Sequence, residues 1–478
     1  MRFVLTLLLI IAPLPAGPVE DLRALIRKEL TASEAPSLAV AVARNGEVVW
    51  AEGFGWADRE KRRPATEHTI YSLASISKPI TATGLMVLVE QGRMDLDKPV
   101  NDYLGVAKLQ ARIGDAREAT VRRVASHTAG LPLHYQFFYE DEPYRRPSMD
   151  ETILRYGNLF TPPGERYLYS NLGYGVLDYV ISRVSGKSYE AFMREEVFVP
   201  LGLTRMSVHV GPGLAEFQAT RYAPDGARIP FYDFDHPGGS AIYSSAHDLV
   251  RFAMLHLKTM QADQKPVLKE AAIDQMRKPV GKLSARTSYG IGWSLTENPG
   301  GYRIAMHTGG MGGVSTALLL IPDEKLAVAA LSNARTDLPH RMADEILARY
   351  LPKWKRSEPA HRQAAPPLPA ALRGEWKGTV STYKGDLPLT LDIRGADDVH
   401  ARLGAQPPAL LNQVAFRDNL LTGRMMGDIG TEDANRRSYS IQFSLVLRGS
   451  VLNGAATAMS LPSNRVGNAL SHWVELKK

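Results

Sequence analysis

The chain has 478 residues, of which 44% are hydrophobic and 22% charged, a composition typical of a globular protein with two or three domains. Its net charge of +7 is spread along the sequence without a run of five or six basic residues, which argues against a nucleic-acid partner. The lack of cysteine excludes disulfides, a cysteine nucleophile, thiolate zinc sites and iron–sulfur clusters.

The N-terminus has the order of regions found in a secretory signal peptide. Arg2 precedes an apolar run over residues 3–12, and prolines and small residues follow up to Ala16. The apolar run is shorter than the roughly 20 residues that a membrane-spanning helix needs, and no later stretch is long enough. We therefore predict a signal peptide over residues 1–16 and an exported protein, periplasmic or secreted, with no stable membrane span.

The region 18–351 is predicted to form one large domain. A helix is expected over 19–30, and two β-rich runs flank Asn45-Gly46, a strong hairpin signal. Three more strand-like runs lie near the far end, around a tight turn at 322–324, and a helix follows over 338–351. The simplest arrangement is an α/β (α+β) fold, in which helices flank one antiparallel sheet built from both ends of the region and the middle is mostly helical.

Ser75 and Lys78 are the first candidates for chemistry. On a helix, residues three apart share one face, and Pro79 restricts the serine to the helix start, because proline is tolerated only in the first turn. A serine hydroxyl needs a base, which a buried lysine of lowered pKa can be, and a helix N-terminus favours a developing oxyanion. The alternative is a serine N-cap beside an exposed lysine. A second Ser-x-x-Lys, Ser381 and Lys384, falls in a predicted strand, where residues three apart face opposite sides.

Two further segments contain tyrosine, asparagine or histidine near predicted turns. Tyr169 and Asn171 follow a Pro-Pro-Gly turn and can project together, although Tyr156 and Asn158 have the same spacing and a buried aromatic beside a helix cap is an equal alternative. His127, in the sequence SHTAGLP, is interpreted as part of a structural turn rather than as a base. The tyrosines and prolines of residues 134–147 suggest a loop over the site.

His307, Thr308 and Gly309 end a predicted strand, and Gly310 follows them. A hydroxyl and a glycine there would let a substrate lie along the strand, with the Gly310 N–H as an oxyanion donor. A glycine-rich turn is the structural alternative. Asp233, Asp235 and His236 could be imagined as metal ligands, but the glycines and proline beside them favour a polar loop. We therefore expect no metal and no cofactor.

The composition changes over residues 352–371, which are rich in proline, alanine and charge and are predicted to be an interdomain linker. Residues 372–478 contain about eight short alternating runs separated by turn residues. This pattern predicts an all-β domain, either a barrel or a sandwich.

These motifs in this order resemble the serine β-lactamase and penicillin-binding-protein superfamily, specifically its branch of class C β-lactamases, D-Ala-D-Ala carboxypeptidases and esterases. The segments 126–132 and 238–252 also resemble that branch, and the C-terminal region resembles lipocalin-like extensions of some of its members. The resemblance covers about residues 20–350. It implies the fold expected above and a small-molecule or peptide substrate, with peptidoglycan as one source.

The resemblance implies a role for each matching residue. Ser75 would be acylated, Lys78 would activate it, and Tyr169 would relay protons. The resemblance leaves open which of the latter two is the base, because coupled groups share their titration. Asn171 would orient the substrate. The segment comprising His307, Thr308 and Gly309 would be the third motif, and the N–H groups of Ser75 and Gly310 would form the oxyanion hole.

One residue departs from the usual pattern of the family. β-Lactamases and peptidases of the superfamily usually carry a lysine where His307 stands, and a histidine is largely neutral at pH 7. We therefore expect a serine acyl hydrolase for small esters, amides or D-amino-acid peptides, with β-lactams less favoured. The alternatives are a penicillin- or peptidoglycan-binding protein without efficient turnover, and a protein that binds a ligand through its β domain.

Overall fold

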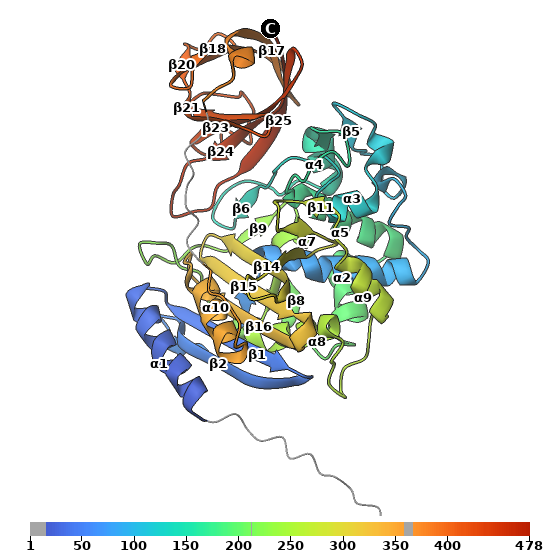
Figure 1. Cartoon of the computed structure of the whole chain (residues 1–478), viewed down its shortest axis with the longest axis vertical. Coiled ribbons are helices and arrows are strands. Elements are labelled where there is room, and N and C mark those ends of the chain that lie inside the picture. Colours follow the sequence, from blue (N-terminus) through green and yellow to red (C-terminus); the bar gives the residue numbers. More distant parts are fainter. Residues whose placement is uncertain (1–15, 212, 358–366) are drawn as a thin grey trace, which may run out of the picture.

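The computed structural model describes residues 16–211, 213–357 and 367–478. The predicted signal peptide therefore lies outside the described residues except for Ala16, and so does the middle of the predicted linker, residues 358–366. The described part has a large region of mixed helices and strands and a smaller β-barrel at the end of the molecule opposite helix α1 (Figure 1).

A nine-stranded antiparallel sheet forms the centre of the large region. Its N-terminal and C-terminal strands meet where β1 pairs with β16, which confirms the predicted sheet built from both ends of the region. Asn45 and Gly46 form the turn between β1 and β2, and both have positive φ angles, 52° and 86°, as a tight hairpin requires. The strands in spatial order are β11 (Gly281–Lys282), β12 (Ser288–Tyr289), β13 (Ser294–Glu297), β14 (Arg303–Met311), β15 (Val314–Ile321), β16 (Leu326–Ser332), β1 (Ser37–Arg44), β2 (Glu47–Asp58) and β3 (Arg63–Pro64).

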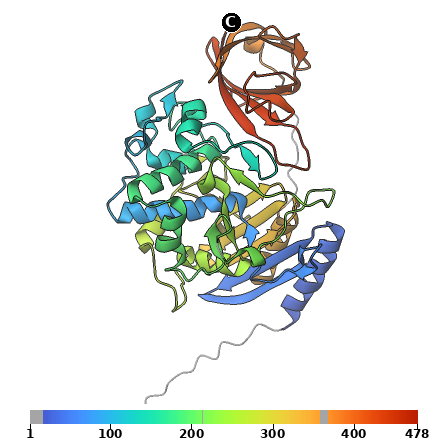
Figure 2. The ribbon, with the colours of Figure 1, turned by 180° about the vertical axis from the view of Figure 1, so that it is seen from behind.

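Helices cover both faces of this sheet. The first and last helices, α1 and α10, pack together on one face and bury an apolar layer against β1, β2, β15 and β16. The other face is covered by α8 and, beyond it, by a mostly helical part of the chain, as Figure 2 shows from behind. The helices are α1 (Ala16–Ala32), α2 (Ser77–Glu90), α3 (Val121–Ala125), α4 (Met149–Tyr156), α5 (Asn171–Ser185), α6 (Tyr189–Met193), α7 (Pro237–Ser240), α8 (Ala246–Leu257), α9 (Glu270–Met276) and α10 (Leu338–Tyr350).

Short strand pairs connect the helical part to the loops. A three-stranded sheet contains β4 (Tyr71–Ser72), β10 (Ile242–Ser244) and β8 (Met206–Val208). One strand pair consists of β6 (Phe137–Tyr139) and β9 (Tyr232–Phe234), and a second of β5 (Gln110–Ala111) and β7 (Asn158–Leu159). The loop predicted over residues 134–147 therefore contains a strand, β6, which pairs with β9.

The C-terminal region is a nearly closed β-barrel, which confirms the predicted all-β domain. Alternate side chains of its strands point inward and form an apolar core, as period-two patterning requires. In spatial order the strands are β20 (Ala409–Leu410), β19 (Asp398–Leu403), β18 (Gly385–Gly395), β17 (Gly374–Thr382), β25 (Ala469–Lys477), β24 (Val451–Ser460), β23 (Tyr439–Arg448), β22 (Leu420–Met425) and β21 (Asn412–Arg417).

The described helices include none that combines the length and the apolar character needed to cross a bilayer.

Candidate active site

Ser75 lies in a tight helical turn, η1 (Ala74–Ile76), that leads directly into α2. The turn is held against the central sheet, since Leu73 accepts a hydrogen bond from Thr316 Oγ1 of β15 at 2.9 Å through its carbonyl oxygen. Ala74 has a φ of 48°, a left-handed conformation that costs energy for any residue with a side chain and recurs at functional sites. The backbone thus holds a half-buried Ser75 at the start of a helix.

Lys78 is fully buried, and its side-chain nitrogen contacts neutral oxygen atoms. Its Nζ lies 3.2 Å from Ser75 Oγ, 2.6 Å from Asn171 Oδ1 and 3.0 Å from the carbonyl oxygen of Gly239 in α7. Burial lowers the pKa of Lys78 well below its usual value of 10.5, because the charged form loses its hydration. A lysine with a lowered pKa, within hydrogen-bond reach of a serine hydroxyl, can accept the proton of that hydroxyl.

Tyr169 and Asn171 reach the same point from the start of α5. Ser170 caps that helix by accepting a hydrogen bond from the N–H of Gly173, which fixes the residues on either side of it. Lys78 Nζ lies 4.7 Å from the centre of the Tyr169 ring. Burial raises the pKa of Tyr169, and a hydrogen bond with Ser75 opposes part of that rise. The phenol is therefore protonated at neutral pH and can donate to a leaving group.

His307 is buried and neutral. Its Nδ1–H donates to the carbonyl oxygen of Thr308 at 2.8 Å, and its Nε2 therefore accepts from the hydroxyl of Tyr289 at 2.9 Å. Burial lowers the pKa of His307 to about 3, and the charge of Lys78 acts in the same direction. Residue 307 thus gives the site no positive charge at neutral pH.

Gly309 lets β14 lie close to the turn that carries Ser75, and Gly310 lies beside an arginine. A side chain at Gly309 would collide with the carbonyl oxygen of Leu73 and with Thr316, so the strand can lie against η1 only with glycine there. The space beside Gly310 is occupied by the guanidinium of Arg335, which follows β16. Residues 307–311 of β14 pair with β15 on one side, while β13 pairs only with residues 303–306 on the other.

The structure therefore brings together the eight residues singled out from the sequence: Ser75, Lys78, Tyr169, Asn171, His307, Thr308, Gly309 and Gly310. Sequence reasoning missed two further groups at this point. The Gly239 carbonyl is a backbone atom 161 residues from Lys78, and Arg335 meets Gly310 only through the pairing of β14, β15 and β16. Neither contact has a local pattern in the sequence.

His127 lies beside these residues but also has a structural role. Its φ of 60° is left-handed, and its Nδ1 accepts a hydrogen bond from the N–H of Ser170 at 3.2 Å. Its ring centre lies 4.5 Å from that of Tyr169, so the turn predicted from SHTAGLP supports the tyrosine directly. Burial and the charge of Lys78 lower the pKa of His127 well below 6.5, so it is neutral.

The other sequence candidates are placed elsewhere. Ser381 lies in β17 and Lys384 pairs with Glu432, while the Tyr156 hydroxyl binds Asp433 of the barrel. Asp235 is held between His134 and His236 at 2.6 Å each. Within residues 16–211, 213–357 and 367–478, no group of three or more histidine, aspartate or glutamate side chains is placed to hold a metal ion.

Comparisons with known proteins give the same family and fold. The family model described as Beta-lactamase matches residues 22–351. Penicillin-binding protein 4* of Bacillus subtilis is 27% identical over 326 residues, an alignment that covers 64% of this chain and 69% of that protein.

Two solved structures show a similar fold along nearly the whole chain, with the barrel included. The octameric penicillin-binding protein homologue from Pyrococcus abyssi has a TM-score of 0.61 at 22% identity, covering 96% of this chain and 100% of that one. The structure of SurE with D-Leu has a TM-score of 0.63 at 24% identity, and the match covers 97% of this chain and 100% of that one.

Proposed function

Because the chain belongs to the Beta-lactamase family, whose model matches residues 22–351, we propose that it is an exported serine acyl hydrolase that forms an acyl-Ser75 intermediate. The superfamily of serine β-lactamases and penicillin-binding proteins consists generally of serine hydrolases. The observation that carries the proposal is the 3.2 Å contact between Ser75 Oγ and the buried Lys78 amine. The substrates are small esters, amides or D-amino-acid peptides.

The proposed reaction has two halves. Ser75 Oγ forms a bond to the substrate carbonyl carbon while its proton passes to the Lys78–Tyr169 pair. The N–H groups of Ser75 and Gly310 then stabilise the oxyanion, and the tyrosine protonates the departing amine or alcohol. Water, deprotonated by the same pair, attacks the acyl carbon, and the proton returns to Ser75 Oγ. Asn171, which binds Lys78 Nζ at 2.6 Å, keeps the lysine oriented.

The pH dependence follows from the environment of Lys78. We expect kcat/KM for a neutral ester to fall by about tenfold per pH unit below the lowered pKa of Lys78, because the protonated amine cannot accept the Ser75 proton. A pH–rate profile of the wild type and of His307→Gln measures this. Both should show the same acid limb, since His307 is already neutral. A limb that vanished in His307→Gln would assign the titration to the histidine.

The charges around β14 bear on the choice of substrate. His307 is neutral, whereas Arg335 is exposed and lies against Gly310, and in the part of the chain that the structure describes no carboxylate pairs with it. A substrate carboxylate would therefore meet Arg335 rather than residue 307. The SurE structure, a similar fold, contains D-Leu, which favours D-amino-acid derivatives as the first compounds to test.

Arg335→Gln is expected to reduce kcat/KM for a D-alanyl-D-alanine peptide by about tenfold relative to the same peptide as its C-terminal amide, because a charge-assisted hydrogen bond is lost. Steady-state kinetics with the matched pair of peptides measures this ratio. Arg341→Gln is the control, since Arg341 lies on α10 and is already paired with Glu29 of α1 at 2.6 Å. An unchanged ratio in Arg335→Gln would show that carboxylates are not recognised there.

A further inference from the structure

We propose that the C-terminal barrel completes the substrate site: the loop between β24 and β25 (residues 461–468, the β24–β25 loop) forms the wall beyond Gly310 and selects the acyl part of the substrate. The inference rests on the proposed function, since it concerns the substrate of the same site. In this proposal the barrel contributes to substrate specificity.

The β24–β25 loop reaches the end of the strand that carries the candidate oxyanion donor. The side chain of Val466 fills the space beside Gly312, in the turn between β14 and β15, so that a Cβ at Gly312 would collide with it. The backbone N–H of Val466 donates to the hydroxyl of Tyr139 at 2.6 Å. Gly312 itself accepts a hydrogen bond from Tyr232 at 2.7 Å. A barrel residue thus lies against the β14–β15 turn, beside the glycine two residues beyond Gly310.

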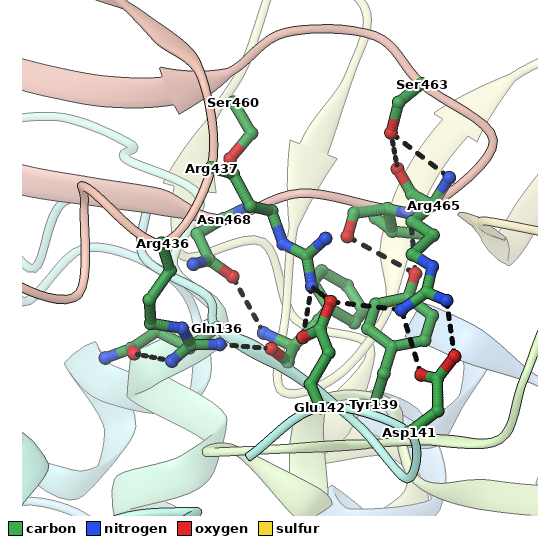
Figure 3. A network of polar contacts seen from close by, with 12 residues as sticks. Gln136, Tyr139, Asp141, Glu142, Arg436, Arg437, Ser460, Ser463, Arg465 and Asn468 are labelled. Carbon is green, nitrogen blue, oxygen red and sulfur yellow. Dashed lines mark hydrogen bonds and ion pairs between the residues drawn. The ribbon is translucent and has the colours of Figure 1, made fainter. Parts of the chain in front are cut away.

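Ion pairs and hydrogen bonds join the barrel to residues 135–142, the segment that contains β6 (Figure 3). Arg437 binds Glu142 at 2.7 Å, and Arg465 binds both Asp141, at 2.9 Å, and Glu142, at 3.1 Å. The Arg437 and Glu142 side chains are only 14% and 16% exposed, so this pair is screened less than a surface pair. Arg436 adds a hydrogen bond to the carbonyl oxygen of Phe137 at 2.6 Å.

Hydrogen bonds of the backbone also join the barrel to residues 135–142. Tyr135 and Ala469 exchange two hydrogen bonds of 2.9 Å, as in an antiparallel sheet, and Asn468 Oδ1 accepts from the N–H of Phe137 at 2.9 Å. The barrel therefore fixes both the β24–β25 loop and residues 135–142.

The open edge of β14 explains why this wall would meet the substrate. Among the residues that the structure describes, no strand pairs with residues 307–311 on the side away from β15, so a substrate bound at Ser75 can extend along them. A substrate that extends past Gly310 then meets Val466 and Ile229, which are apolar and lie beside Gly312. The surface suits an extended acyl group with apolar parts, whereas an acetyl group would not reach it.

The test compares p-nitrophenyl acetate with p-nitrophenyl octanoate in the full-length protein. Val466→Trp should reduce the ratio of kcat/KM for octanoate to that for acetate by about tenfold, and Val466→Ala should raise the ratio or leave it unchanged. The size control is Ala396→Trp, at an exposed position in the β18–β19 turn. Fluorophosphonate labelling of Ser75 at the wild-type rate confirms that each variant is folded.

Removing the ion pairs of Arg437 and Arg465 with residues 141 and 142 gives a second, independent test. The double variant Arg437→Gln/Arg465→Gln should raise KM for octanoate several-fold more than KM for acetate, whereas Arg394→Gln, which breaks an ion pair within the barrel, should change neither. Equal ratios in wild type, Val466→Trp and the double variant, with normal labelling, would overturn the inference. A wild type that neither hydrolyses the esters nor is labelled would instead refute the proposed function.

Discussion

Ser75→Ala is expected to abolish covalent labelling by a fluorophosphonate and to lower kcat by about four orders of magnitude or more, because the variant has no atom to form the acyl intermediate. The remaining contacts around Lys78 do not depend on the Ser75 hydroxyl, so the variant should keep its fold. Intact-mass measurement and peptide mapping after incubation with the reagent show whether an adduct forms and on which residue.

Ser381→Ala is the matched control for this experiment. Ser381 begins the other Ser-x-x-Lys of the chain but lies in β17 of the barrel, so its loss should leave labelling unchanged. Labelling of folded Ser75→Ala at the wild-type rate would show that another residue is the nucleophile. A parallel incubation with a penicillin separates turnover from a stable adduct, which a penicillin-binding protein without efficient turnover would form.

Lys78→Ala is expected to slow acylation of Ser75 by about 10³-fold, in the range of lost general-base catalysis. Lys78→Arg should be similarly slow, because a guanidinium stays protonated at any working pH and cannot accept the serine proton. The rate of fluorophosphonate labelling, followed by intact mass over time, measures the acylation step without the need for a natural substrate.

Lys384→Ala serves as the control, since Lys384 is an exposed lysine paired with Glu432. Circular dichroism should show that each Lys78 variant is folded, because the lysine also binds Asn171 and Gly239. If a folded Lys78→Ala reacted as fast as the wild type, Tyr169 alone would be sufficient as the base. If the double variant Lys78→Ala/Tyr169→Phe also reacted at the wild-type rate, neither member of the pair would be the base.

Local patterns in the sequence were sufficient for much of the fold. The Asn45-Gly46 hairpin and the alternating runs of the barrel are confirmed, since both depend on neighbouring residues. The strands β11, β12 and β13 were missed, because two to four residues are too few to show an alternating pattern. The helix predicted over 19–30 extends over Ala16–Ala32.

The candidate site was predictable only in part. The Ser-x-x-Lys spacing identified Ser75 and Lys78 because helix geometry and Pro79 place both near the helix start. The Gly239 carbonyl, the Arg335 guanidinium and the docking of the barrel on residues 135–142 arise from contacts between distant parts of the chain. Backbone oxygens and exposed arginines are common throughout a sequence, so nothing local distinguishes these from the others.

The burial of Lys78 has a thermodynamic consequence for the whole protein. Its pKa is lowered in the folded state but ordinary, near 10.5, in the unfolded chain, so between these two values unfolding takes up a proton. Where the unfolded state binds more protons, the free energy of unfolding rises with pH. The destabilisation that the buried Lys78 causes therefore disappears above about pH 10.5. The environment that makes the amine a base at neutral pH therefore also lowers the stability of the native state there.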